Sequence, residues 1–269
     1  MMNTEYTARY GLEFNPFLKN SKDILFESTD YHECVYRLGI LSKTHGFGLI
    51  TGAPGRGKTT ILRSWSGSLN PALFKPVYTC LSTLTVQEFY RSLAYGLQIE
   101  PAFRKSDNFR LIRDEILRLS IEKKCTPVII IDEANHISNA ILNDLKMLFN
   151  FEMDSRDPAV VVLAGLPVLN STLKLGIHES LRQRITMSYQ LDGLTKDEAR
   201  HFISEKLSGA GCHSAVFESA AVEGIVNAAE GTPRMICKLC NAALIIGASR
   251  NQQLIDADTV LKAVDECEI

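Results

Sequence analysis

The sequence lacks any apolar run near the ~20 residues that a membrane-spanning helix requires. It also lacks an apolar signal-peptide core in its first residues, so we expect a cytoplasmic protein that contacts no membrane. Its seven cysteines are odd in number and scattered, which does not favour a disulfide framework. Only Cys237 and Cys240 have a metal-like or redox-like spacing, and their apolar helical surroundings favour buried cysteines over such a site.

The chain has little net charge, with 29 Lys and Arg against 31 Asp and Glu among 269 residues. This balance excludes a globally basic nucleic-acid-binding protein. The charge is uneven, however, because residues 190–269 hold 7 basic and 12 acidic residues, a net of −5. Residues 1–189 therefore carry a net of +3, and any nucleic-acid contact is expected from this part.

Short apolar segments alternate with amphipathic ones as far as residue 191, which is typical of strands separated by helices. We expect strands at 47–51, 77–81, 128–131, 160–164 and 185–191. We expect helices at 58–68, 85–97, 107–123 and 138–152, with N-caps at Thr85, Asp107 and Ser138. The alternation predicts an α/β fold with a central, mostly parallel sheet flanked by helices.

The strand pattern disappears after Leu191, and only helical patterns follow. We expect helices at 196–208, 214–229, 233–249 and 257–266. Thr195, with Glu198 three residues later, predicts a capping box at the start of the first of them. We therefore expect three parts, namely an N-terminal arm and helix at 1–45, an α/β core at 46–192 and a small C-terminal helical domain at 193–269.

Residues 52–59, Gly-Ala-Pro-Gly-Arg-Gly-Lys-Thr, match the phosphate-loop pattern G-x-x-x-x-G-K-[ST]. They stand between an expected strand and an expected helix, where loop amides and a helix N-terminus bind phosphates. Lys58 is expected to reach the β- and γ-phosphates of ATP, and the Thr59 hydroxyl to bind Mg²⁺. The expected nucleotide-binding residues of this segment are Gly52, Pro54, Gly55, Arg56, Gly57, Lys58, Thr59 and Thr60.

Two carboxylates, Asp132 and Glu133, follow the expected strand at 128–131. We expect Asp132 to hold Mg²⁺ through water, and Glu133 to orient and polarise the attacking water. An ATPase needs a water-activating carboxylate, whereas a kinase that transfers phosphate to a substrate does not. The pair therefore predicts hydrolysis of ATP to ADP and phosphate.

Three arginines are candidates to stabilise charge in the transition state. Arg182 and Arg184 precede the last expected strand, where one of them can reach the nucleotide of a neighbouring subunit, and Arg184 is narrowly preferred. Arg234 begins an expected helix and can reach back to the γ-phosphate. Each of the three could instead be a solvated surface charge.

Together these parts resemble AAA+ ATPases, and most of all the ExeA-like and MuB/TnsC-like group of bacterial ATPases. The signatures of that group occur at 10–17, 45–52, 131–134, 183–185 and 231–236. The resemblance covers nearly the whole chain and implies an AAA+ P-loop NTPase domain followed by a helical lid. It also implies that Asn15, Pro16 and Phe17 pack near the adenine, although a simply docked N-terminal arm is the alternative.

One position departs from the group. Leu166 follows the expected strand at 160–164, where the group usually has a polar residue that senses the γ-phosphate. Either the sensor is displaced or hydrolysis is slow. We therefore expect slow ATPase activity that oligomerisation, DNA or a partner stimulates.

The resemblance implies an ATPase that oligomerises on double-stranded DNA, as a ring or helical filament, and regulates or targets a transposase or another recombination protein. In this group residues between the second strand and the Asp132 strand hold the DNA, largely independently of base sequence. The corresponding candidates are Thr83, Arg104, Lys105, Ser106 and Arg110, unless this segment is only a solvated helix face. An ExeA-like secretion or assembly ATPase that acts on proteins, and another AAA+ switch protein, are the alternative functions.

Overall fold

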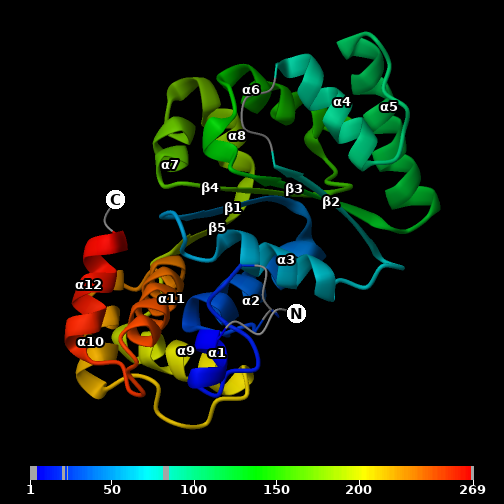
Figure 1. Cartoon of the computed structure of the whole chain (residues 1–269). Coiled ribbons are helices and arrows are strands. Elements are labelled where there is room, and N and C mark those ends of the chain that lie inside the picture. The colour runs from blue at the N-terminus through cyan, green and yellow to red at the C-terminus, as the bar shows by residue number, and fades with distance from the viewer. Residues whose placement is uncertain (1–4, 20–21, 23, 81–84, 268–269) are drawn as a thin grey trace. The chain divides into compact units, whose positions relative to one another are not determined.

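The computed structural model describes residues 5–19, 22, 24–80 and 85–267, and these residues form two compact units (Figure 1). One, here called the helical unit, comprises Met1–His32, Pro54–Gly57 and Asp192–Ile269. The other, here called the sheet unit, comprises Glu33–Ala53 and Lys58–Leu191.

The sheet unit is built on a parallel five-stranded sheet with the strand order β2-β3-β4-β1-β5. The strands are β1 (Gly46–Gly52), β2 (Phe74–Cys80), β3 (Thr126–Asp132), β4 (Val160–Gly165) and β5 (Ile185–Leu191). β3 and β4 read as continuous apolar runs because they lie inside the sheet and are buried on both faces. The α/β fold expected from the sequence is thereby confirmed.

Helices cover both faces of the sheet. The helices of this unit are α2 (Thr29–Thr44), which begins in the helical unit, α3 (Lys58–Ser68), α4 (Val86–Gly96), α5 (Lys105–Leu117), α6 (Asn139–Leu148), α7 (Val168–Leu173) and α8 (Glu179–Arg184). Shorter helical turns are η1 (Arg118–Glu122), η2 (Ala134–His136), η3 (Glu152–Asp154) and η4 (Gly176–His178). The helices α4 to α8 lie on one face, and α2 and α3 lie on the other (Figure 1).

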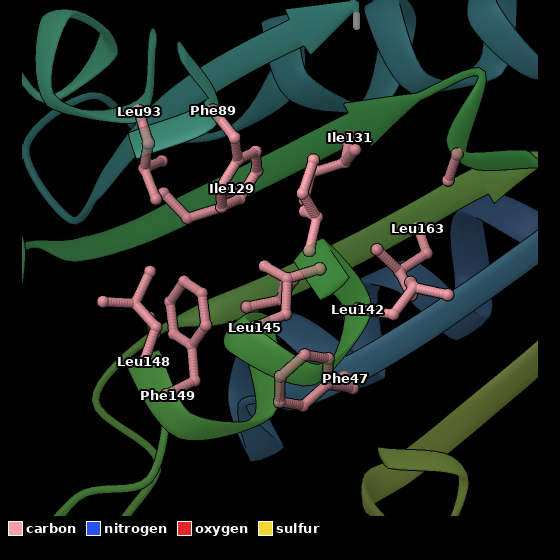
Figure 2. Packing of buried hydrophobic residues seen from close by; sticks show 14 of the residues in the cluster. Phe47, Phe89, Leu93, Ile129, Ile131, Leu142, Leu145, Leu148, Phe149 and Leu163 are labelled. Carbon is pink, nitrogen blue, oxygen red and sulfur yellow. The ribbon is translucent and has the colours of Figure 1, made fainter. Parts of the chain in front are cut away.

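The largest apolar core of the sheet unit lies between the sheet and the helices α4 to α8. Alternate residues of the strands, among them Phe47, Ile129 and Leu163, point to this face. There they meet Phe89 of α4 and Leu145 of α6 (Figure 2). Each of these five side chains is at most 1% exposed, and burial of a side chain of this size contributes about 1.5–3 kcal/mol. This core fixes the strands that carry the candidate site.

Three consecutive strands bring their carboxyl ends to one edge of the sheet. β4 pairs in parallel with β1, where Thr51 lies opposite Gly165, and with β3, where Ile131 lies opposite Leu163. Residues that directly follow these strands therefore lie near one another, as is usual for ligand sites of open parallel sheets.

The helix expected at 107–123 begins earlier and is divided. α5 begins at Lys105, and Asp107 lies in its first turn rather than at its N-cap. Asn108 explains the early start, because its amide accepts a hydrogen bond from the Ala102 N–H (2.7 Å) and donates one to the Ala102 carbonyl (3.0 Å). These bonds close the loop just before the helix. After Leu117 the chain continues as the π-helical turn η1.

The helix expected at 138–152 ends at Leu148. The Arg113 guanidinium of α5 donates hydrogen bonds to the carbonyls of Met147 (3.3 Å), Leu148 (3.0 Å) and Asn150 (2.6 Å). It also stacks 4.1 Å from the centre of the Phe151 ring, and its burial lowers the pKa of Arg113. The last carbonyls of a helix need such donors, and here the donor belongs to another helix. A local pattern therefore does not reveal this helix end.

The helical unit contains α1 (Glu5–Arg9), α9 (Lys196–Gly209), α10 (Ser219–Ala229), α11 (Pro233–Ser249) and α12 (Ala257–Cys267). The capping box of Thr195 and Glu198 is present at the start of α9. α10 begins five residues later than expected because the preceding residues are extended. There the Glu218 N–H donates to the Ile255 carbonyl, and the Ile255 N–H donates to the Val216 carbonyl, both at 2.9 Å.

Cys237 and Cys240 both lie on α11, and burial raises the pKa of both thiols. Within the described residues, no group of three or more His, Cys, Asp or Glu side chains is placed to hold a metal ion. None of the helices described is both long and apolar enough to cross a membrane.

Candidate nucleotide-binding site

The phosphate loop connects β1, which ends at Gly52, to α3, which begins at Lys58. Gly55 and Gly57 have φ angles of +78° and +97°, a region that favours glycine. The first N–H groups of a helix have no intrahelical acceptor, so the N-terminus of α3 suits a phosphate. By its contacts Pro54–Gly57 belongs to the helical unit, whereas Lys58 belongs to the sheet unit.

Lys58 is buried, with 6% of its surface exposed. Its ammonium donates hydrogen bonds to the carbonyls of Gly52 (2.7 Å) and Ala53 (3.1 Å), the first two residues of the loop. A buried ammonium beside the loop is the charge that a phosphate chain requires. Thr60, the last residue of the expected set, is partly exposed in the first turn of α3.

The side chains of Thr59 and Asp132 meet although 73 residues separate them. The Thr59 hydroxyl donates to Asp132 Oδ2 at 2.7 Å, and the Tyr78 hydroxyl donates to the same oxygen at 2.9 Å. Asp132 is 1% exposed, so these bonds stabilise a buried carboxylate. A hydroxyl and a carboxylate side by side provide the oxygen donors that Mg²⁺ prefers, and the arrangement therefore fits a magnesium site.

Glu133 has a left-handed backbone conformation, with φ +53° and ψ +36°. Its N–H donates to Asp132 Oδ1 at 2.9 Å. A non-glycine residue in this region costs free energy and is often found at functional sites. The turn directs the chain out of β3 and leaves the Glu133 side chain partly exposed directly after Asp132.

Polar side chains lie at the end of β4 even though Leu166 is apolar. The Leu166 N–H donates to Asn135 Oδ1 at 2.8 Å. Asn170, in the first turns of α7, donates through Nδ2 to the Thr51 hydroxyl at 3.2 Å, one residue before Gly52. Sequence analysis did not identify Asn135 or Asn170, because neither stands at the expected position after the strand. Asn170 is therefore a candidate for the displaced sensor.

The two arginines of α8 have different surroundings. Arg184 is partly buried, donates to the Lys146 carbonyl at 3.1 Å, and has its pKa lowered by burial. Arg182 is exposed, and within the described part of the chain its side chain has no hydrogen-bond or ion-pair partner. The geometry therefore favours Arg182, rather than Arg184, as the arginine that can reach another subunit.

Within the helical unit, Arg234 packs against the phosphate loop. A Cβ placed on Gly55 would lie 2.8 Å from Arg234 Cβ and 3.0 Å from Thr232 Cγ2. Arg56 turns its guanidinium to the main-chain carbonyls of Asp192 and Gly231. The loop thus contacts the residues that begin α11, and Nη1 of Arg56 is bound to main-chain carbonyls of this unit.

The N-terminal residues expected near the adenine pack within the helical unit. Asn15 is buried, and its Nδ2 donates to the Tyr6 hydroxyl (3.0 Å) and to Asn241 Oδ1 (2.7 Å). Its Oδ1 accepts a hydrogen bond from the Phe17 N–H at 2.9 Å, across Pro16. Phe17 is 6% exposed and belongs to the apolar core of this unit. These contacts agree with a docked arm, and the contact with adenine stays a prediction.

The segment expected to bind DNA uses part of its charge internally. Lys105 forms an ion pair with Asp144 at 2.7 Å, and Ser106 faces Asp107 at 3.5 Å. Arg104 and Arg110 are exposed. Thr83 lies outside the described residues. The segment therefore offers two exposed arginines rather than a continuous basic surface.

The family model described as an AAA domain matches residues 41–173 of this chain. This segment contains the phosphate loop, Asp132, Glu133 and four of the five strands. Together with the sheet and the helices around it, the match defines the class: residues 41–173 match an AAA domain, and the chain has the fold of AAA+ P-loop NTPases.

The chain is similar to general secretion pathway protein A of Aeromonas hydrophila, with 30% identity over 268 residues. The match covers 97% of this chain and 48% of that protein, so the chain spans about half the length of this relative. The similarity supports the ExeA-like part of the expected resemblance. It gives no support to the MuB/TnsC-like part.

Solved structures with the same fold include Cdc6p of Pyrobaculum aerophilum, with a TM-score of 0.71 and 14% identity over 93% of this chain and 70% of that one. The ORC2 protein of Aeropyrum pernix has a TM-score of 0.68 and 16% identity over 94% and 71%. The RuvB branch migration motor of Thermotoga maritima has a TM-score of 0.59 and 20% identity over 89% and 72%. At these identities the likeness is one of fold.

Proposed function

We propose that this chain is an ExeA-like AAA+ ATPase in which ATP binding and hydrolysis control association with protein partners. The observation that carries the proposal is the meeting of the Thr59 hydroxyl and the Asp132 carboxylate at 2.7 Å, one residue after the buried Lys58. This arrangement is not expected to stabilise the fold, because it places the Lys58 ammonium and the Asp132 carboxylate in the protein interior. It suits a phosphate chain with its metal ion.

In the proposed mechanism the loop amides and Lys58 bind the phosphates of ATP. Lys58 exchanges the loop carbonyls of Gly52 and Ala53 for phosphate oxygens, and this exchange replaces neutral acceptors with charged ones. Thr59 and Asp132 hold Mg²⁺, which when bound neutralises charge on the β- and γ-phosphates. Tyr78 keeps the Asp132 carboxylate oriented through its own hydrogen bond.

For hydrolysis we assign the attacking water to Glu133. Its carboxylate accepts the proton of the water that displaces ADP from the γ-phosphate. Asn170, which is linked to Thr51 at the start of the loop, takes the role of the displaced sensor and orients this water or the γ-phosphate. Hydrolysis is expected to be slow in an isolated subunit, because a charge that stabilises the transition state has to come from a neighbour.

That charge is assigned to Arg182 of a neighbouring copy of the chain. Arg182 is exposed, whereas Arg184 is bound to the carbonyl end of α6. A homo-oligomer, as a ring or a filament, would place such an arginine at each nucleotide. The proposal links ATP binding to assembly, and assembly to hydrolysis.

Double-stranded DNA binding linked to a transposase is the second candidate function. Arg104 and Arg110 remain exposed, and Phe103 between α4 and α5 is 84% exposed. Two structures of similar fold, Aeropyrum pernix ORC1 and Drosophila ORC, were solved with DNA at 16% and 15% identity. The relative at 30% identity, by contrast, is named for secretion, and this favours protein partners.

Light scattering of the purified protein with Mg²⁺, with and without the slowly hydrolysed analogue ATPγS and plasmid DNA, tests the proposal. The proposed function predicts assembly that depends on ATPγS and is unchanged by DNA. Assembly that requires both ATPγS and DNA would instead support the second candidate. Both functions are wrong if ATPγS at millimolar concentration does not bind to the wild-type protein and the Lys58→Ala variant behaves in the same way.

A further inference from the structure

Arg56, the variable residue before Gly57 in the phosphate loop, does not extend into solvent. Its Nη1 donates a hydrogen bond to the Asp192 carbonyl at 2.5 Å and another to the Gly231 carbonyl at 3.0 Å. The phosphate-loop pattern places no requirement on this side chain. Two hydrogen bonds from one cation to two separate turns therefore need an explanation beyond phosphate binding.

The two turns form a slot that fits the guanidinium. Gly193 has φ +91°, and a Cβ at this position would lie 1.8 Å from Arg56 Nη1. Gly231 has φ +69°, and a Cβ there would lie 3.0 Å from the same nitrogen. A Cβ on Gly231 would also lie 2.3 Å from the Leu194 carbonyl oxygen, so both positions require glycine for their backbone conformation and for space. A side chain at Gly193 would displace the arginine, and one at Gly231 would displace the main chain that the arginine binds.

The first of these turns is fixed from its other side. The carboxylate of Asp30 accepts hydrogen bonds from the N–H groups of Asp192 (2.9 Å) and Gly193 (2.8 Å). Since Asp30 holds the N–H groups and Arg56 holds a carbonyl, the turn is bound through both kinds of main-chain group. It offers Arg56 a well-defined acceptor, as a preorganised site requires.

The second turn leads directly to Arg234. The Gly231 carbonyl accepts from both the Leu194 N–H (2.8 Å) and Arg56, and α11 begins two residues later at Pro233. Arg234 then packs on Gly55, the residue before Arg56 in the loop. Arg56 and Arg234 are therefore connected in two ways. The main chain of residues 231–233 leads from the carbonyl that Arg56 binds to Arg234, and Gly55 is next to Arg56 in the chain and in contact with Arg234.

We propose that Arg56 is a positioning residue that holds the turn bearing Arg234 against the phosphate loop, so that Arg234 is set to recognise the γ-phosphate. This inference rests on the proposed function, because it assumes that the loop binds ATP. A charged donor on two carbonyls fixes the turn before the nucleotide arrives. Recognition of the γ-phosphate then costs less conformational entropy. Arg56 thereby favours ATP over ADP without contacting the third phosphate.

Three variants, Arg56→Ala, Arg234→Ala and the double variant, test the proposal through their affinities for ATPγS and ADP. Arg56→Ala should lower the affinity for ATPγS about tenfold more than that for ADP, since a hydrogen bond from a charged group contributes about 1.5–3 kcal/mol. The double variant should lose no more ATPγS affinity than Arg234→Ala alone. Arg56→Lys should restore part of the preference, because an ammonium lacks the planar fork of arginine.

Hydrogen exchange without nucleotide provides an independent measurement. In Arg56→Ala the amide of Leu194, which donates to Gly231, should exchange several-fold faster than in the wild-type protein. Arg91→Ala removes an exposed arginine of α4 and serves as the matched control, for which no such change is expected.

The proposal is overturned if wild-type protein binds ATPγS but Arg56→Ala keeps the full preference over ADP. It is also overturned if the losses of the two single variants multiply in the double variant. If the wild-type protein binds neither nucleotide, the proposed function is wrong. In that case, unchanged exchange at Leu194 in Arg56→Ala would also remove the structural basis of this inference.

Discussion

The phosphate site and the basic segment at 104–113 both carry residues that the sequence marks as ligand-binding, and the structure uses them differently. In the first, the Thr59 hydroxyl meets the Asp132 carboxylate at the end of β3, and the buried Lys58 bonds to carbonyls of the same loop. In the second, Lys105 pairs with Asp144, and Arg113, farther along the same helix and not among the candidates, closes the end of α6. The difference shows that residue type alone does not indicate which charges are available to a ligand. The position of a residue relative to the strand ends does indicate this for the phosphate site.

The largest effect is expected at Lys58. Lys58→Ala should lower ATP affinity by about 30- to 150-fold, because the bond of a buried ammonium to phosphate contributes about 2–3 kcal/mol, and hydrolysis should disappear with it. Titration with a fluorescent ATP analogue measures the change. Lys43→Ala, at an exposed lysine of α2, is the control and should bind as the wild-type protein does. If Lys58→Ala bound ATP as tightly as the wild-type protein, Lys58 would not bind the phosphates and the assigned phosphate site would be wrong.

Glu133→Gln separates binding from chemistry. The amide keeps the size of the side chain but cannot accept the proton of water, so hydrolysis should fall by about 1,000-fold while ATP affinity stays within about twofold. Phosphate release and equilibrium binding measure the two quantities. A variant that hydrolyses ATP at the wild-type rate would show that the general base lies elsewhere.

The two arginines of α8 provide a matched comparison. Arg182→Ala should reduce hydrolysis in the assembled protein by about 100-fold, the usual effect of losing one donor to a transition state, without changing ATP binding. Arg184→Ala should instead lower thermal stability, because the Lys146 carbonyl loses its donor. ATPase assays as a function of protein concentration, together with thermal melts, distinguish them. The reverse result would exchange the two roles.

The smallest effect compares two arginines three positions apart on α5. Arg113→Ala should lower the free energy of unfolding by about 2 kcal/mol, because three carbonyls and the Phe151 ring lose their partner. Arg110→Ala should change it by less than about 0.5 kcal/mol, as is usual for exposed residues. Urea unfolding measures both. Equal effects would contradict the distinction between structural and available charges.

Much of the sheet unit follows from local sequence. The strands, the phosphate loop, the N-cap of Ser138 and the capping box of Thr85 depend on residues within a few positions of one another. Asp132 could also be placed, because the carboxyl ends of parallel strands share an edge.

Other features depend on residues that are distant in the chain. Tyr78 reaches Asp132 from a neighbouring strand, and Asn170 reaches Thr51 from a helix that follows β4. Neither contact has a characteristic spacing, so the sequence did not indicate it. The choice between Arg182 and Arg184 likewise depends on how far each side chain is buried. The sequence does not show this, because the two residues are only two positions apart in one short segment.

The dependence of ATPγS affinity on Mg²⁺ in the wild-type protein and in Asp132→Asn tests the central claim most directly. The wild-type protein should bind ATPγS more tightly as Mg²⁺ rises, because we propose that Thr59 and Asp132, whose side chains lie 2.7 Å apart, hold the ion. Asp132→Asn, measured beside it in excess EDTA and in excess Mg²⁺, should lose most of this gain and keep the metal-free affinity. An equal gain in both proteins would contradict the assignment of Thr59 and Asp132 as the magnesium site.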